Sequence, residues 1–495
     1  MVKGHRSESD LRMLLANKLK QLSPVKQQLL KRQLKGRILS TDDSMPAVDA
    51  SGLPAPLSYN QQRLWFLDQL RPGSAQYNVY RAWYIDGPLN LPALDSALQS
   101  ILDRHQVLRM RIRKSGGALI QDGNTSAAVP TTFVDLGSSP RQDREKLAIG
   151  KISEEAGIPF NLSAGPFLRS VLVKLAENYH VLLIVLHHIA SDGWSCRVFR
   201  DELTRCYEAF SCGRVPELAD LPFQYGDFAR YQRTLFSGQR RTTLLRYWCE
   251  QLSGSLDPLD LPSDFPRPAI QSDRGSKLQF DLGPGLSEAV HGFCREHGIT
   301  LFMLLIAVLY TLLHRYTGVP DISVGSPIAN RTLPELEPLI GYVTNTNVLR
   351  MDLSGNPGFM ELVQRVKKIA LDAYMYQDMP FEELVAELHP DQDRSRTPLF
   401  QVAFILQNTP EKVLHIHGAK VTPIKISNGT SKFDLSLCIN IKDGNLSGFW
   451  EYCTDLFKQP RMARLAEDYR AMLTGALADP HQSIGALPLS ARQDA

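Results

Sequence analysis

Two adjacent histidines carry the side chains that most directly suggest chemistry in this sequence. His187 and His188 stand next to each other, and Asp192 and Gly193 follow after three further residues. An imidazole titrates near neutral pH, so it can accept or give a proton under cellular conditions. Asp192 can fix the local geometry by pairing with a cation or with backbone N–H groups, and Gly193 lets the backbone approach a substrate. The segment therefore combines a titratable pair with a turn that can shape a site.

The elements around this segment decide whether its side chains reach a substrate. Residues 181–186 are a run of branched apolar side chains, which predicts a buried strand. The histidines follow at its end, where a rigid scaffold presents side chains to a cleft. The alternative is a pair of core histidines with satisfied hydrogen bonds. Further strand-like runs alternate with helical ones and predict mixed α/β layers; they cover residues 80–85, 107–112 and 170–173.

The composition predicts a globular chain with at least two cores. It has 495 residues, of which 43% are hydrophobic, and a domain takes about 150 residues on average. The net charge of +3 gives no general attraction to nucleic acid or to a membrane surface. The seven cysteines form no CxxC pair and are odd in number, which argues against a disulfide framework or a zinc site.

No targeting or membrane-spanning segment is predicted. The first ten residues are charged and lack the apolar stretch of a signal peptide. The longest apolar run, 301–313, is too short to cross a bilayer and predicts a buried helix. We therefore expect a cytoplasmic protein with no membrane or nucleic-acid partner.

The N-terminal segment differs in charge from the rest of the chain. Ten Lys and Arg residues face two acidic residues over positions 1–40. Leucines at helical spacing, followed by Ser23 and Pro24 as a helix start, predict two short helices in residues 1–39. They form either a hairpin packed on the main domain or a basic docking element for an acidic partner. Residues 40–56 are rich in Ser, Pro, Gly and Asp and predict a flexible linker.

A series of further motifs places the histidine segment in a family context. They are LSYNQQRLWFL (57–67), RHQVLR (104–109), YGDFARY (225–231), VGSPIANR (324–331), IGYVTNT (340–346), YQDMPFE (376–382), RSRTPLF (394–400), KFDL (432–435) and EYCTDLF (451–457). With HHIASDG between the second and third of them, this series resembles the signature motifs of the condensation domains of non-ribosomal peptide synthetases. These belong to the chloramphenicol-acetyltransferase-like acyltransferases. The resemblance covers about residues 55–485.

Two positions depart from the family pattern. Val343 and Thr344 stand where the fifth motif usually has Phe and Val, so either the channel is wider there or the floor of the interface is repacked. Tyr376 stands where the sixth motif often has His, which removes a titrating group.

The resemblance implies a fold and an activity. The fold class is α/β, with α+β two-layer lobes of chloramphenicol-acetyltransferase-like type arranged as a V-shaped pseudo-dimer. We expect the N-lobe at 57–255, a crossover at 256–274, the C-lobe at 275–485 and the start of a linker towards an adenylation domain at 486–495. The implied enzyme is an acyltransferase. The α-amine of an acceptor aminoacyl thioester attacks a donor acyl or peptidyl thioester, and a peptide bond forms. Both substrates arrive on phosphopantetheine arms of carrier-protein domains, so the chain itself binds no cofactor.

The resemblance also suggests roles for the histidine segment. His188 faces the attacking amine, either as a base or by orienting it, while His187 packs and supports. Asp192 makes a structural ion pair, with Arg109 as its candidate partner. Gly193 either offers its N–H to the developing oxyanion or keeps space clear. Three residues are expected in the substrate channel: Asn345, Thr346 and Tyr59.

Other activities remain as alternatives. A starter domain of the same fold attaches a fatty-acyl group, and an epimerase acts at the α-carbon. A non-catalytic recruiting platform shares the fold but typically lacks the histidine motif, and a cyclising relative has Asp residues in place of the histidines. No metal site is predicted, because His415 and His417 supply only two ligands.

Overall fold

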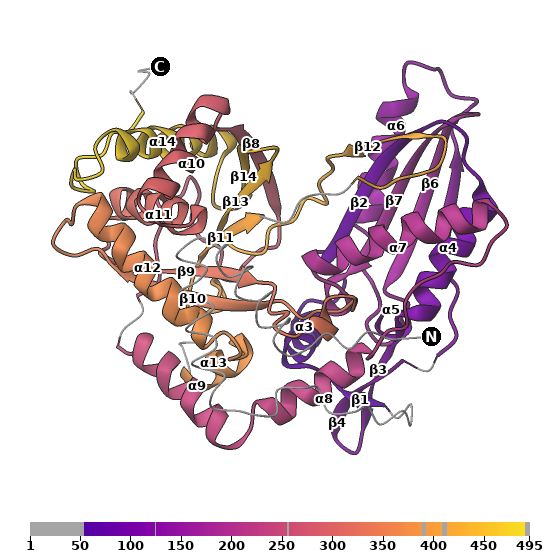
Figure 1. Ribbon diagram of the computed structural model, residues 1–495, viewed down its shortest axis with the longest axis horizontal. Coiled ribbons are helices and arrows are strands. Elements are labelled where there is room, and N and C mark those ends of the chain that lie inside the picture. The colour runs from indigo at the N-terminus through magenta and orange to yellow at the C-terminus, as the bar shows by residue number, and fades with distance from the viewer. Residues whose placement is uncertain (1–53, 124, 255–256, 389–392, 408–412, 491–495) are drawn as a thin grey trace, which may run out of the picture.

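The computed structural model of the protein describes residues 54–123, 125–254, 257–388, 393–407 and 413–490. The helices predicted in 1–39 and most of the linker predicted at 40–56 lie outside these residues. Two lobes stand beside each other and form a V (Figure 1). The N-lobe is built on a five-stranded sheet and the C-lobe on a six-stranded sheet. The predicted mixed α/β, two-lobed architecture is thus confirmed.

The N-lobe sheet is covered by helices on both faces. Alternate residues of its central strand belong to two different apolar clusters, one on each face. This is why the strand's sequence is a continuous apolar run rather than an alternating one. One face carries α4 (Leu91–Arg104) and α7 (Gly193–Ser211), and the other carries α6 (Arg144–Ala156). The strands lie in the order β12 (Lys420–Ile424), β2 (Asn78–Asp86), β7 (Tyr179–His187), β6 (Leu168–Ala176) and β5 (Thr131–Asp135).

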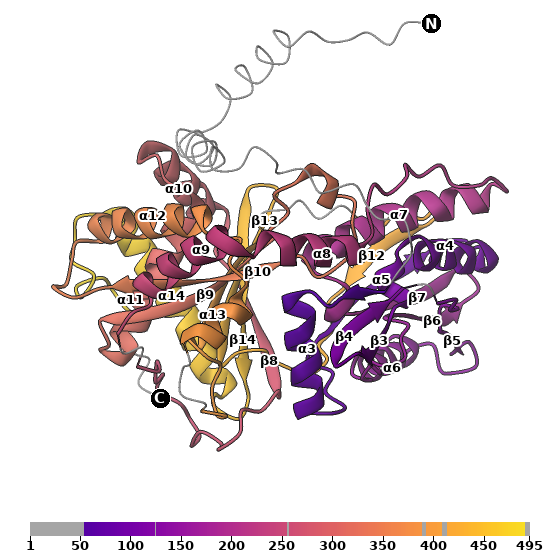
Figure 2. The same ribbon diagram turned by 90° about the horizontal axis from the view of Figure 1, so that it is seen from below.

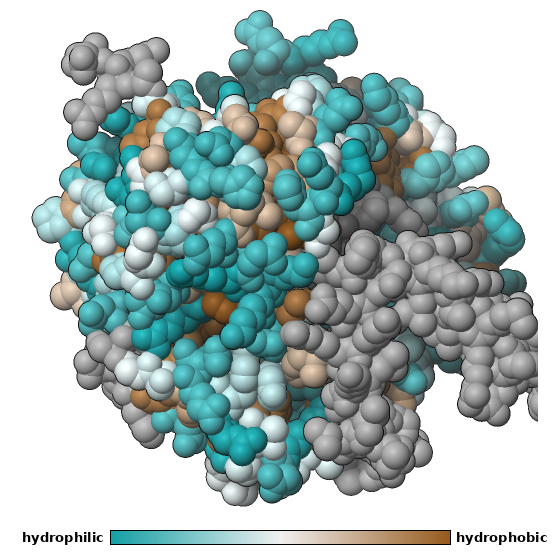
Figure 3. Space-filling model, turned by 60° about the vertical axis from the view of Figure 1, so that its left-hand side comes forward, coloured by the Kyte–Doolittle hydropathy of each residue, from teal (hydrophilic) through white to brown (hydrophobic). Residues whose placement is uncertain are grey.

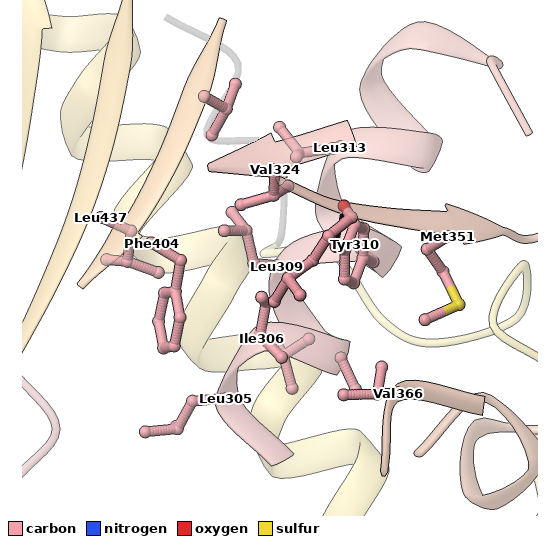
Figure 4. Packing of buried hydrophobic residues seen from close by; sticks show 14 of the residues in the cluster. Leu305, Ile306, Leu309, Tyr310, Leu313, Val324, Met351, Val366, Phe404 and Leu437 are labelled. Atoms are coloured by element: carbon pink, nitrogen blue, oxygen red, sulfur yellow. Dashed lines mark hydrogen bonds between the residues drawn. The ribbon is translucent and has the colours of Figure 1, made fainter. Parts of the chain in front are cut away.

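The C-lobe is organised around helix α11 (Leu301–Thr317). Its side chains from Met303 to Leu313 are all buried, which confirms the helix predicted over 301–313. Figure 4 shows Leu305, Leu309 and Tyr310 of α11 among residues of the neighbouring sheet and helix. Helices α10 (Pro284–Glu296), α12 (Phe359–Met375) and α14 (Gln459–Ala478) complete the layer. The strand order is β10 (Asn345–Asp352), β9 (Asp321–Ile328), β11 (Val402–Gln407), β13 (Leu435–Lys442), β14 (Asn445–Cys453) and β8 (Gly275–Asp281).

Three segments cross the lobe limits expected at 57–255 and 275–485. Strand β12 leaves the C-lobe and pairs antiparallel with β2 at the edge of the N-lobe sheet. Helix α9 (Gly238–Gln251) packs its apolar face into the C-lobe core, and α8 (Tyr225–Leu235) leads to it across the base of the V (Figure 2). The loop between β9 and β10 buries Leu336 and Val343 in the N-lobe core. Each segment is held by apolar burial on the other lobe, so the two lobes are interlocked rather than consecutive.

Two local predictions need correction. The strand expected at 107–112 begins as a short helix, α5 (Gln106–Arg109), and β3 (Arg111–Ser115) follows it. Val107 and Leu108 are both buried, and the N–H of Leu108 donates to the carbonyl of His105 at 3.0 Å, as in a helical turn. At the end of the predicted linker, β1 (Ala55–Pro56) pairs with β4 (Ala118–Asp122). The described part of the expected crossover, residues 257–274, contains no helix or strand, and its one β-bridge joins Arg274 to Thr430.

Most of the large apolar side chains are buried in the cores of the two lobes. On the face shown in Figure 3, hydrophilic residues predominate and hydrophobic ones form smaller groups between them. Within the described ranges, no single helix has the length and hydropathy needed to cross a bilayer, and α10 and α11 reach that measure only as a pair bent by 110°. The more apolar of the two, α11, is a core helix.

Candidate active site

The histidine segment lies where a buried strand ends and a long helix begins. Strand β7 ends at His187, a single 3-10 turn (His188–Ala190) follows, and Asp192 caps α7 by accepting the Ser195 N–H at 2.8 Å. The backbone N–H of His188 donates to the carbonyl of Tyr77 at 2.8 Å. Both histidines are thus held by regular backbone structure.

His187 is turned into the core. Its Nδ1 accepts the N–H of Ile189 at 3.1 Å, and its ring packs against Phe160 and Phe167. Burial lowers the pKa of His187 to about 3, with a further contribution from His188. The ring is therefore neutral at physiological pH and closes the turn, which fits the supporting role expected for it.

Replacing His187 with asparagine is expected to reduce the acid sensitivity of the fold. The neutral histidine stabilises the native state fully above the unfolded-state pKa of about 6.5, and this contribution is lost as the pH falls below it. Asparagine can still accept the Ile189 N–H but does not titrate. The difference in unfolding free energy between pH 7 and pH 5, measured by urea denaturation, should shrink by about 2 kcal/mol. An unchanged difference would contradict the neutral, buried assignment.

His188 faces the space between the lobes. Its ring centroid lies 4.3 Å from that of Tyr342 and 6.5 Å from that of Tyr77. Burial, with a smaller contribution from the ammonium of Lys432, lowers the pKa of His188 to about 3, against the opposing effect of the Asp192 carboxylate. The imidazole is therefore uncharged at neutral pH. It is a good hydrogen-bonding group and a weak base.

Asp192 ties the N-lobe to the loop between β9 and β10. Its carboxylate is fully buried. Burial alone would raise the pKa of Asp192, but the guanidinium of Arg331 and the donors of Ser195 hold it below its usual value. One oxygen accepts the N–H and O–H of Ser195 at 2.8 and 2.7 Å, and the other accepts the N–H groups of Val343 and Thr344 at 3.1 Å. The residue is therefore a structural anchor with no free acceptor directed at the cavity.

The cation that pairs with Asp192 is Arg331 rather than the expected Arg109. The Arg331 guanidinium lies 3.1 Å from the carboxylate and is almost fully buried. Arg109 instead donates to the carbonyl groups of Gly123, Thr125 and Asp103 within its own lobe. The partner comes from the C-lobe because the loop after β9 reaches back over the start of α7.

A cavity of about 1230 Å³ lies between the two lobes, and His188 and Gly193 both line it. Gly193 is the first residue of α7, and a Cβ built on it would meet no atom within 4 Å. Helix α7 also contributes Trp194 and Arg197. The opposite wall comes from the C-lobe and includes Ser326, Ile328, Tyr374, Tyr376, Gln407 and Lys432.

The three expected channel residues are not part of this cavity wall among the described residues. The buried amide of Asn345 donates to the carbonyls of Gln377 and Met379, so it holds backbone in place. Thr346 lies in β10, opposite Pro327 of β9. Tyr59 packs edge-on against Phe236 and beneath the guanidinium of Arg233. None of the three lines this cavity, and their role in a channel stays a prediction.

The structure adds three residues that sequence reasoning did not assign to the site. Arg331, Tyr342 and Lys432 all lie within motifs recognised in the sequence. Their place in a motif marked them as candidates for the site. The sequence did not show that these C-lobe residues lie next to the histidine segment of the N-lobe. In the part of the chain that the structure describes, no group of three potential metal ligands is found.

Comparison with known proteins places this geometry in a family. The model of the condensation domain matches residues 54–494. The chain is 42% identical over 441 residues to a linear gramicidin synthase protein of Brevibacillus parabrevis, and the match covers 89% of this chain and 6% of that protein. It is 35% identical over 491 residues to phosphinothricin tripeptide synthetase PhsC of Streptomyces viridochromogenes, covering 97% of this chain and 44% of that protein. The chain thus spans less than half the length of either synthetase.

A solved structure supports the same assignment. The X-domain from teicoplanin biosynthesis, determined in complex with OxyB, superposes with a TM-score of 0.80 at 28% identity and covers 89% of this chain and 96% of that chain. The family match over almost the whole chain, the similarity to synthetases and the interlocked two-lobed fold together show that the chain belongs to the condensation-domain family of non-ribosomal peptide synthetases.

Proposed function

We propose that the chain forms an amide bond between two carrier-bound substrates. A donor acyl or peptidyl thioester and an acceptor aminoacyl thioester, each on the phosphopantetheine arm of a carrier-protein domain, meet in the cavity between the lobes. An adenylation domain next to the chain would supply the acceptor. The observation that carries this proposal is the position of His188 and Gly193 on the wall of one cavity.

The size of the cavity fits a reaction between two large substrates. Its volume of about 1230 Å³ exceeds the roughly 300–1,000 Å³ of a typical single-ligand pocket. A thioester is already activated, so holding the amine and the carbonyl together is the main contribution expected from the protein. Such positioning is worth up to about 7–11 kcal/mol in favourable cases.

Within this reaction, His188 orients the amine rather than deprotonating it. A base is most effective when its pKa lies near the working pH, and the pKa of His188 is about 3. The acceptor α-amine has a pKa of about 8, so its neutral form is well populated at cellular pH. A neutral imidazole nitrogen can accept a hydrogen bond from that amine and aim its lone pair at the donor carbonyl.

Gly193 shapes the space beside His188. As the first residue of α7 it has a backbone N–H without an intrahelical acceptor, and this group can stabilise the negative charge that develops on the attacked carbonyl oxygen. Because the residue carries no side chain, substrate can approach that N–H.

Replacing Gly193 with alanine separates this role from folding. The added methyl meets no protein atom within 4 Å, and alanine is the better helix former, so the thermal stability should not fall. The transfer rate should nevertheless drop by about 10-fold, because a methyl that misplaces the substrate carbonyl by a fraction of an ångström weakens its alignment. Single-turnover mass spectrometry measures the rate, and differential scanning calorimetry checks the fold. An unchanged rate would remove Gly193 from the site.

A recruiting platform is the second candidate, favoured by the similarity to the X-domain. The neutral His188 on an open cavity wall instead favours catalysis. The two are separated by loading one carrier with a panel of aminoacyl, peptidyl and fatty-acyl donors and a second carrier with amino acids. Intact-mass detection of acyl transfer to the acceptor carrier supports condensation and identifies the donor class. Carrier binding without transfer of any donor supports the platform.

A further inference from the structure

Lys432 places an ammonium group on the cavity wall without an acidic partner. Among the described residues, no carboxylate oxygen lies within the 4.0 Å of an ion pair from its Nζ. The acid that influences it most, Glu451, is bound by Lys277 at 3.3 Å. The Nζ instead lies 5.6 Å from the ring centroid of Tyr77, the ring that also contacts His188. A partly buried cation without a counter-ion acts on other charges in the same cavity more strongly than a solvated one does.

The other acids around the cavity are already neutralised. Asp192 is paired with Arg331, and Glu382 is paired with Arg63 at 3.6 Å. Asp378, the acid on the cavity wall itself, is paired with Arg240 at 2.6 Å. Among the described residues the charge balance at the cavity is therefore positive, with Lys432 near His188 and Arg197 over the ring of Trp194. The titratable and charged groups that face Lys432 and His188 from the surrounding elements are His187, Tyr77, Tyr342, Arg63, Glu382, Lys277, Glu451, Asp192 and Arg331.

We propose that Lys432 acts through space on the acceptor amine and holds it in the uncharged, nucleophilic form when it binds beside His188. This inference rests on the proposed condensation. A protonated acceptor amine would bring a second positive charge into the cavity beside Lys432. The acceptor therefore releases its proton to solvent when it binds, and Lys432 keeps its own. The freed lone pair forms the C–N bond, the C–S bond of the donor breaks, and the departing sulfur takes up the proton that the nitrogen loses.

The same charge adds to the effect of burial in keeping His188 neutral. Lys432 is one of the causes that lower the pKa of His188, and burial lowers the pKa of Lys432 itself to about 8, so Lys432 is mainly protonated at neutral pH. The imidazole of His188 and the acceptor amine are then neutral together. This is the combination in which an imidazole can accept a hydrogen bond from an amine.

The test compares Lys432→Met with Lys432→Arg, which keeps the charge. Single-turnover transfer of one donor–acceptor pair is measured from pH 6 to pH 9. In Lys432→Met the acid limb of the pH–rate profile should move to higher pH by roughly one unit, the shift expected from one like charge within about 10 Å. The rate at pH 6 should fall about 10-fold, with a loss that shrinks as the pH rises. Lys432→Arg should keep the limb near its wild-type position.

Folding does not confuse this comparison. Removing an unpaired, partly buried charge is expected to leave stability unchanged or raise it, and thermal unfolding of both variants checks this. A limb that does not move in Lys432→Met, or a rate loss that is equal at every pH, overturns the inference, while transfer by the wild type still establishes condensation. A wild type that transfers no substrate contradicts the proposed function and this inference with it.

Discussion

Replacing His188 with alanine is expected to lower the single-turnover rate of amide transfer by about 100-fold, the loss that follows when a reacting group is misplaced by about 1 Å. The imidazole lies on the wall of the inter-lobe cavity and is neutral. Its removal leaves the amine without the hydrogen bond that aims it. The rate is read from the mass gained by the acceptor carrier.

His188→Gln distinguishes orientation from proton removal. The glutamine amide has a hydrogen-bonding atom close to the position of the imidazole Nε2 but cannot take up a proton at these pH values. If His188 orients the amine, the glutamine variant should retain clearly more activity than the alanine variant. Equal loss in the two variants would favour a base instead. Circular dichroism melts of both variants control for folding, because His188 also contacts Tyr342.

Replacing Asp192 with alanine is expected to destabilise the fold by about 3–5 kcal/mol, as for other broken buried ion pairs. The change leaves the Arg331 guanidinium buried without a counter-ion and removes the acceptor of Ser195, Val343 and Thr344. Urea denaturation measures the loss. Activity should fall as well, because the loop that closes over α7 is no longer anchored, so an inactive variant would not identify Asp192 as a catalytic acid.

A double-mutant cycle isolates the pair. Arg331→Met alone should also destabilise, whereas the double variant with Asp192→Ala should lose less than the sum of the two single losses by about 1–3 kcal/mol. Arg109→Met combined with Asp192→Ala is the matched control, because Arg109 donates to backbone carbonyls of its own lobe. Additive losses for the Arg331 pair, or coupling for the Arg109 pair, would contradict the observed geometry.

Local pattern predicted much of what positions the site. The apolar run at 181–186 predicts β7 because the strand is buried on both faces, and 301–313 predicts α11 because that helix is surrounded by its lobe. The position of the histidines at a strand end followed from the same pattern. The order of the motifs then predicted the family and its two lobes.

Contacts between distant segments could not be predicted in the same way. Arg109 was chosen as the partner of Asp192 within the same lobe, but the loop after β9 brings Arg331 across. Nothing in the local pattern of 420–424 shows that this strand completes the sheet of the other lobe. The short motif around Asn345 suggested a channel, yet its amide is occupied by backbone carbonyls. In each case the interaction depends on how the lobes interlock, which no local periodicity encodes.

The most direct measurement is single-turnover transfer between two loaded carriers by the wild type and by the alanine and glutamine variants of His188, followed by intact mass from pH 5 to pH 8. A neutral, orienting His188 predicts transfer by the wild type, a loss of about 100-fold in the alanine variant, partial recovery in the glutamine variant and no limb near pH 6.5 that depends on His188. The contradicting result is an acid limb near pH 6.5 in the pH–rate profile of the wild type that is absent from both variants, together with an equal loss of activity in the two variants. That result would establish His188 as a titrating base.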